Sequence, residues 1–275
     1  NIARYIEASV ADETPAAEPI PQSLADHWIL SQLSEAQQQV EKQLESYHFA
    51  EAAETIYHVV WDDVADWFVE VSKVEQNINM NAYVLDAVLR LSHPFAPFVT
   101  ETIWQALPWH DTILAGEAWI KPAKYDDIAA GQFGRLKNLV SEVRYVMSEL
   151  PGNKRYGMLY MDDSLVADNA ELIQKLARVK SVEHVDQARG LRLAVSGRDA
   201  WLDLDDNTLY EHQTNLEKRL ANVRQQVKTL EARLANENYI AKAPAHLVEE
   251  TRRQLAEEQA LIKRLQTELQ VIARS

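Results

Sequence analysis

Two heptad repeats near the end of the chain constrain its fold more than any other feature. The first repeat has one polar exception, Gln213, among the apolar residues Leu209, Leu216, Leu220, Val223, Val227, Leu230 and Leu234. The second has two polar exceptions, Thr251 and Glu258, among Val248, Leu255, Ile262, Leu265, Leu269 and Ile272. Each repeat predicts one face of a coiled-coil helix. Because only the short polar stretch 236–244 joins them, we expect the two helices to fold back as an antiparallel hairpin.

The predicted hairpin is long for the surface that it can bury. Each helix of about 28 residues spans roughly 42 Å at 1.5 Å per residue. A hairpin of that length buries little beyond its own seam. It is therefore typical of an arm that reaches a partner.

The first segment, residues 1–130, is helical by its hydrophobic period. One helix is predicted from Ser23 to Tyr47 and a second from Phe49 to Val74. On the wheel of the second helix, the polar stripe of His58, Asp62, Asp66 and Glu70 lies opposite the apolar residues Val60, Trp61, Val64, Trp67, Phe68 and Val71. A third helix runs from Ala82 to His93, where Pro94 and Pro97 should break it because proline lacks the amide donor. Three or four such helices make a bundle.

The second segment, residues 131–206, alternates between helical and extended patterns. Helices are predicted over Arg135–Leu150 and Leu165–Arg178. Short strands are predicted over Gly157–Met161, Val182–Val185, Leu191–Val195 and Ala200–Leu204. The whole chain is thus predicted to be mainly α, with a helical bundle (1–130), a small α+β connecting module (131–206) and an antiparallel coiled-coil hairpin (207–275).

The charge is distributed unevenly along the chain. The net charge is -14, and residues 1–130 hold 6 Lys/Arg against 21 Asp/Glu. Residues 207–275 hold 11 Lys/Arg against 9 Asp/Glu. Binding to phosphates depends on where cations lie rather than on total charge. A polyanion can therefore bind the last segment, whereas the acidic first segment must use few, well-placed contacts.

The sequence shows no active site. There is no cysteine, which excludes a thiol nucleophile and a Cys-ligated metal, and no Gly-rich phosphate loop or nucleophile elbow is present. The stripe that begins at His58 faces away from the predicted core, which favours a solvated acidic surface over a metal site. We therefore expect no catalytic residue, no metal and no cofactor in this chain. Its start at Asn1, without Met or an apolar leader, and the lack of a membrane-length apolar run predict a piece of a longer cytoplasmic protein.

The cations of the predicted hairpin leave two interpretations open. Lys and Arg side chains lie on both helices beside several glutamates, so they either solubilise the flanks of the seam or contact phosphates. Tyr239, at the turn, either stacks on a base or holds the two helices together.

Four motifs of the first segment resemble the anticodon-binding helical domain of class I aminoacyl-tRNA synthetases. They are Asn1-Ile2-Ala3-Arg4-Tyr5, the stretch 24–31 (LADHWILS), the stretch 61–70 (WDDVADWFVE), and 93–101 (HPFAPFVTE) with Trp104. The valine, isoleucine and leucine enzymes share these motifs. The chain departs from the pattern at His27 and Gln32, where the family usually or often has Arg.

The hairpin turn favours one of these enzymes. The stretch 238–244 (NYIAKAP) between two heptad helices is similar to the tip of the C-terminal coiled coil of valyl-tRNA synthetases. Bacterial isoleucine enzymes typically end in a cysteine-ligated zinc module, which a chain without cysteine cannot form.

The resemblance implies a tRNA-binding portion of a valine–tRNA ligase, which joins valine to tRNA(Val) with ATP and Mg. The catalytic and editing domains would precede Asn1, since their signature motifs are absent. Asn1, Arg4 and Trp28 would contact the anticodon loop. The arm would contact the outer corner of the tRNA through Arg219, Arg224, Lys228, Arg233, Tyr239, Lys242, Arg252 and Arg253. We expect a monomer that binds no membrane. The alternatives are a coiled-coil scaffold for protein interaction, or the same region of an isoleucyl- or leucyl-tRNA synthetase.

Overall fold

The structure is a computed structural model that describes the chain except for residues 11–17, 122, 153 and 273–275. It divides into two compact units, Asn1–Lys137 and Asn138–Ser275. The boundary falls inside one helix, α7 (Asp127–Glu149), which contributes its first half to unit 1 and its second half to unit 2. The predicted division into three segments at 130 and 206 stays a prediction.

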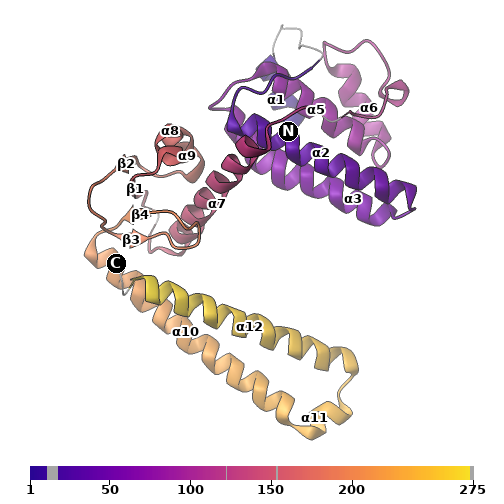
Figure 1. Cartoon of the computed structure of the whole chain (residues 1–275). Helices are drawn as coiled ribbons and strands as arrows, with labels where there is room; N and C mark the ends of the chain where they lie inside the picture. Colours follow the sequence, from indigo (N-terminus) through magenta and orange to yellow (C-terminus); the bar gives the residue numbers. More distant parts are fainter. Residues whose placement is uncertain (11–17, 122, 153, 273–275) are drawn as a thin grey trace. The chain divides into compact units, whose positions relative to one another are not determined.

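Unit 1 is a bundle of helices, as the hydrophobic period predicts. Its other helices are α1 (Ile2–Val10), α2 (Leu24–Glu45), α3 (Phe49–His58), η1 (Val59–Phe68), α4 (Val69–Ser72), α5 (Ile78–Ser92), α6 (Pro97–Ala106) and a short 3₁₀ turn, η2 (Leu114–Gly116). The pairs α2–α3 and α1–α5 lie side by side (Figure 1). Pro94 follows the end of α5, and Pro97 occupies the first position of α6, where a missing amide costs nothing.

Two capping residues connect the starts of α2 and α5. Ser23 caps α2 by accepting from the backbone N–H of Asp26 at 3.3 Å, and Asn77 caps α5 by accepting from the N–H of Met80 at 3.2 Å. The Asn77 amide also donates to the buried carboxylate of Asp26 at 2.8 Å. Burial raises the pKa of Asp26, while its hydrogen bonds oppose that shift. These contacts fix the two helices at one end.

The middle of the second predicted helix does not have the α-helical period that the prediction assumes. Residues Val59–Phe68 form a π-helix, which has more residues per turn than an α-helix. The winding turns Trp61 away from the core, and 57% of its surface is exposed, whereas Trp67 and Phe68 stay buried. The prediction that Trp61 belongs to the core face is therefore wrong.

Unit 2 contains a small four-stranded sheet with the order β2-β1-β4-β3. The strands are β1 (Gly157–Tyr160), β2 (Val182–His184), β3 (Leu191–Arg192) and β4 (Ala200–Asp203). Strand β1 pairs with β2 in parallel across the helices α8 (Ser164–Asp168) and α9 (Ala170–Ala177), and with β4 antiparallel. Gly190 precedes β3 with φ +78°, where a Cβ would lie 2.1 Å from the Leu202 carbonyl oxygen, so only glycine fits.

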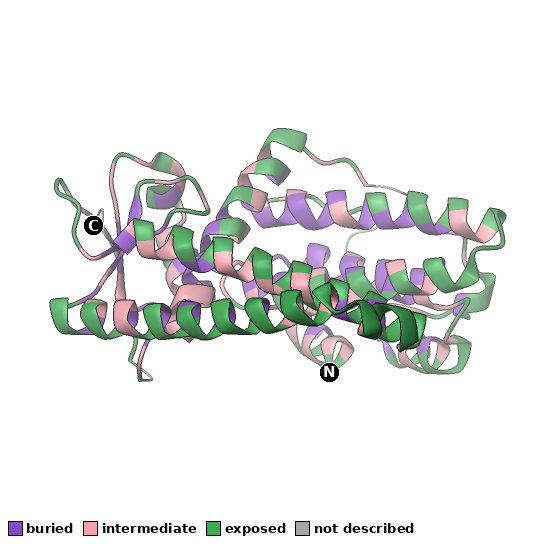
Figure 2. Ribbon diagram, turned by 90° about the horizontal axis from the view of Figure 1, so that it is seen from below, coloured by how far each residue is buried: buried purple, intermediate pink, exposed green. Residues whose placement is uncertain are grey.

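The predicted hairpin is present as a long arm in unit 2. It consists of α10 (Asp206–Ala235), a short turn helix α11 (Glu237–Lys242) and α12 (Ala245–Ile272). Along the seam, Leu216, Leu220, Val223, Val227, Val248 and Leu265 are buried, and most other arm residues are exposed (Figure 2). The mainly α fold with a small α+β module is thus confirmed.

Candidate nucleic-acid interface

The start of the chain presents two of the three predicted anticodon contacts to solvent. Asn1, directly before α1, and Arg4 on α1 are exposed, and the Asn1 carbonyl accepts the first helical hydrogen bond from Tyr5 at 3.1 Å. The hydroxyl of Tyr5 accepts from Ser72 at 3.1 Å, and Lys73 lies 5.8 Å from the Tyr5 ring centroid. This end of the bundle therefore combines aromatic and cationic groups, which suit the unstacked bases of an RNA loop.

The third predicted contact, Trp28, is a core residue. Only 5% of its surface is exposed, and its ring lies against Phe133 with the centroids 5.0 Å apart. The ammonium of Lys137 lies 4.6 Å from the Trp28 centroid and 3.0 Å from the carboxylate of Asp63. A base cannot reach this indole without displacing the packing around it. The structure therefore assigns Trp28 to packing, in contrast with the predicted base contact.

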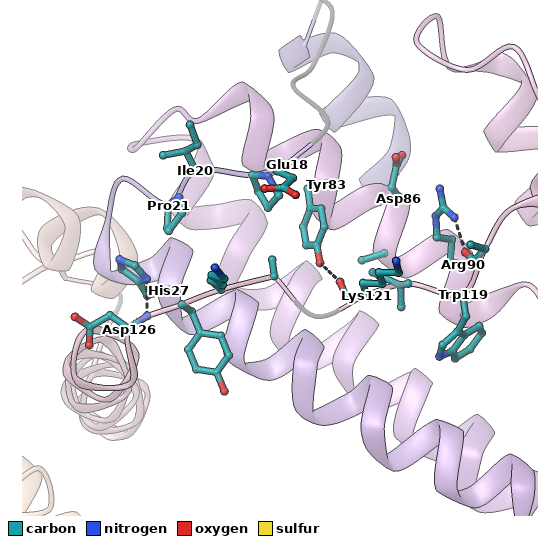
Figure 3. Close-up of a pocket in the computed structure, with 17 residues that line it drawn as sticks. Glu18, Ile20, Pro21, His27, Tyr83, Asp86, Arg90, Trp119, Lys121 and Asp126 are labelled. Atoms are coloured by element: carbon teal, nitrogen blue, oxygen red, sulfur yellow. Dashed lines mark hydrogen bonds between the residues drawn. The ribbon is translucent and has the colours of Figure 1, made fainter.

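The stretches 117–121 and 123–126 cross α2 and α5, and together we call them the strap. Three side chains of these helices donate to its backbone carbonyls: Gln37 to Ile120 at 2.5 Å, Arg90 to Ala118 at 2.6 Å, and Tyr83 to Lys121 at 3.1 Å. The backbone N–H of Asp126 donates to Nδ1 of His27 at 3.0 Å, as Figure 3 shows. An arginine at position 27 has no acceptor and could not make this contact.

A cavity of about 830 Å³ lies along the strap (Figure 3). Its lining includes Arg90, Lys121 and Lys124, which are three of the six Lys/Arg side chains among residues 1–130. The aromatic residues Tyr83, Trp119 and Tyr125 line it as well, together with the acids Glu18, Asp86 and Asp126. No sequence pattern predicts this cavity, because the strap becomes its wall only in the folded chain.

An exposed aromatic pair on α3 and η1 is a second feature that the sequence pattern does not predict. The rings of Tyr57 and Trp61 lie parallel, with an interplanar angle of 5° and their centroids 6.2 Å apart, and each residue is 57% exposed. Beside them Nδ1 of His58 lies 2.7 Å from the carboxylate of Asp62, and this hydrogen bond raises the pKa of His58. His58, Asp62 and Asp66 of the polar stripe are thus exposed, as predicted, and Glu70 is partly exposed. The described residues contain no cluster of three or more His, Asp or Glu positioned to hold a metal ion.

At its base, the arm is fixed by two side chains of α7. Glu149 forms an ion pair with Arg219 of α10. The guanidinium of Arg264 lies 3.8 Å from the Tyr145 ring centroid, and the Tyr145 hydroxyl donates to Glu268 at 3.3 Å. One helix thus contacts both arm helices. These contacts engage Arg219 within unit 2, although sequence analysis predicts it as a tRNA contact.

At its tip, Tyr239 joins the two arm helices. Its hydroxyl lies 2.8 Å from Oγ1 of Thr251 and donates to the Leu247 carbonyl at 3.1 Å. The guanidinium of Arg233 lies 4.7 Å from the Tyr239 ring centroid. Of the two predicted roles, the geometry favours holding the helices together. It also explains why the seam contains a threonine at position 251.

Tyr239→Phe should destabilise the arm without changing its fold. The variant removes the hydroxyl that bridges α11 and α12, and one such hydrogen bond contributes about 1 kcal/mol. Urea unfolding followed by far-ultraviolet circular dichroism measures the loss. The control is Tyr210→Phe, since Tyr210 is 69% exposed on α10. Equal stability of Tyr239→Phe and the unmodified chain would show that the bridge contributes nothing.

Several predicted arm contacts are free to meet a ligand. Every arm cation on the predicted list is exposed, and so is Lys263. Arg252 pairs with Glu249 at 3.5 Å and Arg253 with Glu257 at 3.7 Å, both exposed pairs of the kind that contributes little. Within the described part of the chain, Arg224, Lys228, Lys242 and Lys263 have no ion-pair partner.

A second cavity, of about 730 Å³, lies at the base of the arm. Its lining includes Val146, Leu191, Val195 and Ile272 together with His212 of α10. His212 is 4% exposed, and its Nδ1 has no hydrogen-bond partner among the described residues. Burial lowers the pKa of His212, although the nearby carboxylate of Glu268 opposes that shift.

Acid should destabilise unit 2 through His212. The folded state holds the imidazole neutral, whereas the unfolded state protonates it near the ordinary value of 6.5. The stabilisation is therefore complete above that pH and is lost as the pH falls below it. We expect the free energy of unfolding of unit 2 to drop less between pH 7.5 and 5.5 in His212→Gln than in the unmodified chain. Replacing the exposed His246 by Gln should leave the pH dependence unchanged, and an equal drop in all three proteins would contradict the assignment.

None of the helices within the described residues combines the length and the apolarity that crossing a membrane requires.

Comparison with known proteins agrees with this architecture. Residues 26–155 match the family model for the anticodon-binding domain of tRNA ligases, and residues 209–273 match the model for the tRNA binding arm of valyl-tRNA synthetase. A helical bundle with exposed cationic and aromatic groups, followed by a coiled-coil arm, is thus the tRNA-binding architecture of a class I tRNA ligase.

The relatives define the family more narrowly. The valine–tRNA ligase of Streptomyces avermitilis is 32% identical over 275 residues, which cover 95% of this chain and 31% of that protein. The valine–tRNA ligase of Thermotoga maritima is 34% identical over 258 residues, which cover 88% of this chain and 30% of that protein. The chain belongs to the valine–tRNA ligase family, and it spans about a third of the length of these relatives.

Proposed function

We propose that this chain grips tRNA(Val) for a valine–tRNA ligase, with the bundle at the anticodon loop and the arm at the outer corner of the tRNA. The observation that carries the proposal is the arm, which exposes cations along two helices that bury little except their seam. Contacts of cations with phosphates position an RNA without reading its sequence. The exposed residues Asn1, directly before α1, and Arg4 on α1 are the proposed anticodon contacts.

The reaction of the parent enzyme is part of the same proposal. The parent joins valine to its tRNA using ATP and Mg, and those ligands bind to the catalytic part of the enzyme. No residue of this chain takes part in the chemistry. The parent acts in the cytoplasm as a monomer, in contact with no membrane.

Binding to tRNA transcripts tests the proposal. The chain should bind a transcript with a valine anticodon at low salt, and its affinity should fall roughly 100-fold or more between 50 and 200 mM salt because several phosphate contacts release counterions. Arg4→Ala should reduce the preference for that transcript over one with an altered anticodon, with unchanged thermal stability. Lys42→Ala is a matched control, since Lys42 is an exposed cation on a different helix.

A protein-interaction scaffold predicts a different result. In that case the chain would form a salt-insensitive dimer in sedimentation experiments and would have no affinity for tRNA.

A further inference from the structure

The two polar faces of the arm differ in the contacts that their Lys and Arg side chains make within the chain. One contact between the two long arm helices defines their register: the Gln259 amide of α12 donates to Glu231 of α10 at 3.4 Å. In an antiparallel hairpin, each step along α12 from this contact matches one step back along α10. Lys263 is therefore level with Val227, near the middle of the arm.

The Glu231–Gln259 contact marks one face, which we call the open face. On α10, Arg224 and Lys228 precede Glu231 by seven and three residues, which places them on the same side of the helix. On α12, Arg252 lies seven residues before Gln259 and Lys263 four residues after it, which places both on the side of the helix that carries Gln259. The open face thus includes Arg224, Lys228, Glu231, Glu249, Arg252, Gln259, Lys263 and Gln266.

The opposite face, which we call the docked face, holds its cations in structural contacts. Glu149 and Tyr145 of α7 engage Arg219 and Arg264 there, and Arg233, two heptads from Arg219, lies over the Tyr239 ring. The glutamates of α12 on this face are Glu250, Glu257 and Glu268. An RNA on the docked face would meet these carboxylates and would compete with the anchor contacts.

On the open face, three cations without ion-pair partners among the described residues gather at one level. Arg224 and Lys228 are one helical turn apart, about 6 Å between their Cβ atoms. Lys263 lies across the seam at the same level, and packed helices are about 8–10 Å apart. The glutamates of this side are engaged by neighbours, Glu231 by Gln259 and Glu249 by Arg252.

We infer that the open face is the RNA-binding face of the arm, with Arg224, Lys228 and Lys263 on the phosphate backbone of a double-stranded RNA stem. Gln259 and Gln266, one heptad apart, follow the same side of α12. Their amides can donate to and accept from ribose 2′-hydroxyls, which line the shallow groove of A-form RNA. The inference rests on the proposed function, which it narrows from the whole arm to one face.

Charge-matched double variants of the full chain test the inference against a tRNA transcript. Lys228→Gln with Lys263→Gln removes two cations from the open face. Lys218→Gln with Lys180→Gln removes two exposed cations that lie outside the open face, Lys218 on the back of α10 and Lys180 just before β2. The two variants have equal net charge. Circular dichroism should show equal helix content for both.

The open-face variant should bind the transcript about 10- to 50-fold more weakly at 0.1 M salt, and its plot of log affinity against log salt should lose about two units of slope. The control should bind within about threefold of the unmodified chain. Equal losses in both variants, or an unchanged open-face variant, would overturn the inference while leaving the proposed function intact. No binding by the unmodified chain would overturn the proposed function, and this inference with it.

Discussion

Replacing residues 227–263 by a four-residue Gly/Ser turn should weaken tRNA binding about 100-fold at 0.1 M salt. Position 227 faces position 263, so the replacement ends both arm helices at the same level of the arm. It retains the anchors Arg219, Arg264 and Glu268. It removes six Lys/Arg and six Asp/Glu, so the net charge of the chain does not change. The expected loss therefore reflects lost phosphate contacts at fixed positions rather than a change in total charge. Filter binding with a tRNA transcript measures it.

Two properties of the chain outside the arm show whether the shortened chain folds normally. The sheet and α7 are untouched, so the thermal unfolding of unit 1 and the fluorescence of Trp201 in unit 2 should match the unmodified chain. A shortened chain that binds tRNA with full affinity would show that the arm does not grip the RNA.

Trp28→Ala should destabilise unit 1 by about 3–5 kcal/mol, the usual effect of deleting a buried aromatic side chain. The variant loses the packing against Phe133 and leaves the ammonium of Lys137 without one of its two aromatic neighbours. Urea unfolding followed by tryptophan fluorescence measures the effect, because six of the seven tryptophans belong to unit 1.

Trp61→Ala is the matched control for Trp28→Ala. Trp61 lies in the same unit but is 57% exposed, so its removal should cost less than about 1 kcal/mol. If Trp28→Ala instead kept full stability and lost only its preference among anticodons, Trp28 would be a base contact and the packing role would be wrong.

The arm is predictable from sequence because the heptad repeats that stabilise it lie in two helices that follow one another in the chain. A heptad seam needs only the side chains of two neighbouring helices, and the polar stretch 236–244 allows one way of joining them. Local signals also predict the start of α2 at Ser23 and the end of α5 before Pro94, whereas the predicted start of α5 at Ala82 is too late because Asn77 caps the helix further upstream. Thr251 is a polar exception in the second heptad repeat. The repeat cannot explain this residue, because its hydrogen-bond partner Tyr239 belongs to the turn.

The winding of Val59–Phe68 is not predictable from an assumed period of 3.6 residues. A π-helix changes the angle between successive side chains, so the wheel that correctly buries Val64 and Phe68 misplaces Trp61. The conformation of the strap is also not predictable from a local pattern. Its conformation depends on side chains of distant helices, Gln37 and Tyr83, whose hydrogen bonds to its carbonyls no local pattern reveals.

For the candidate site, the sequence identifies which residues carry a positive charge but not which of them are free of contacts within the chain. Arg219 and Arg224 look alike in the sequence, yet the structure pairs the first with Glu149 and leaves the second exposed without an ion-pair partner in the described residues. That difference arises from the contact of α7 with one side of the arm. It decides which cations are free for phosphates.

Hydroxyl-radical footprinting of a tRNA(Val) transcript bound to the chain tests the central claim most directly. The account predicts two separate protected regions, the anticodon loop and the outer corner, and loss of the corner protection alone when residues 227–263 are replaced. A single protected region, or protection at the corner that survives the shortening of the arm, would contradict it.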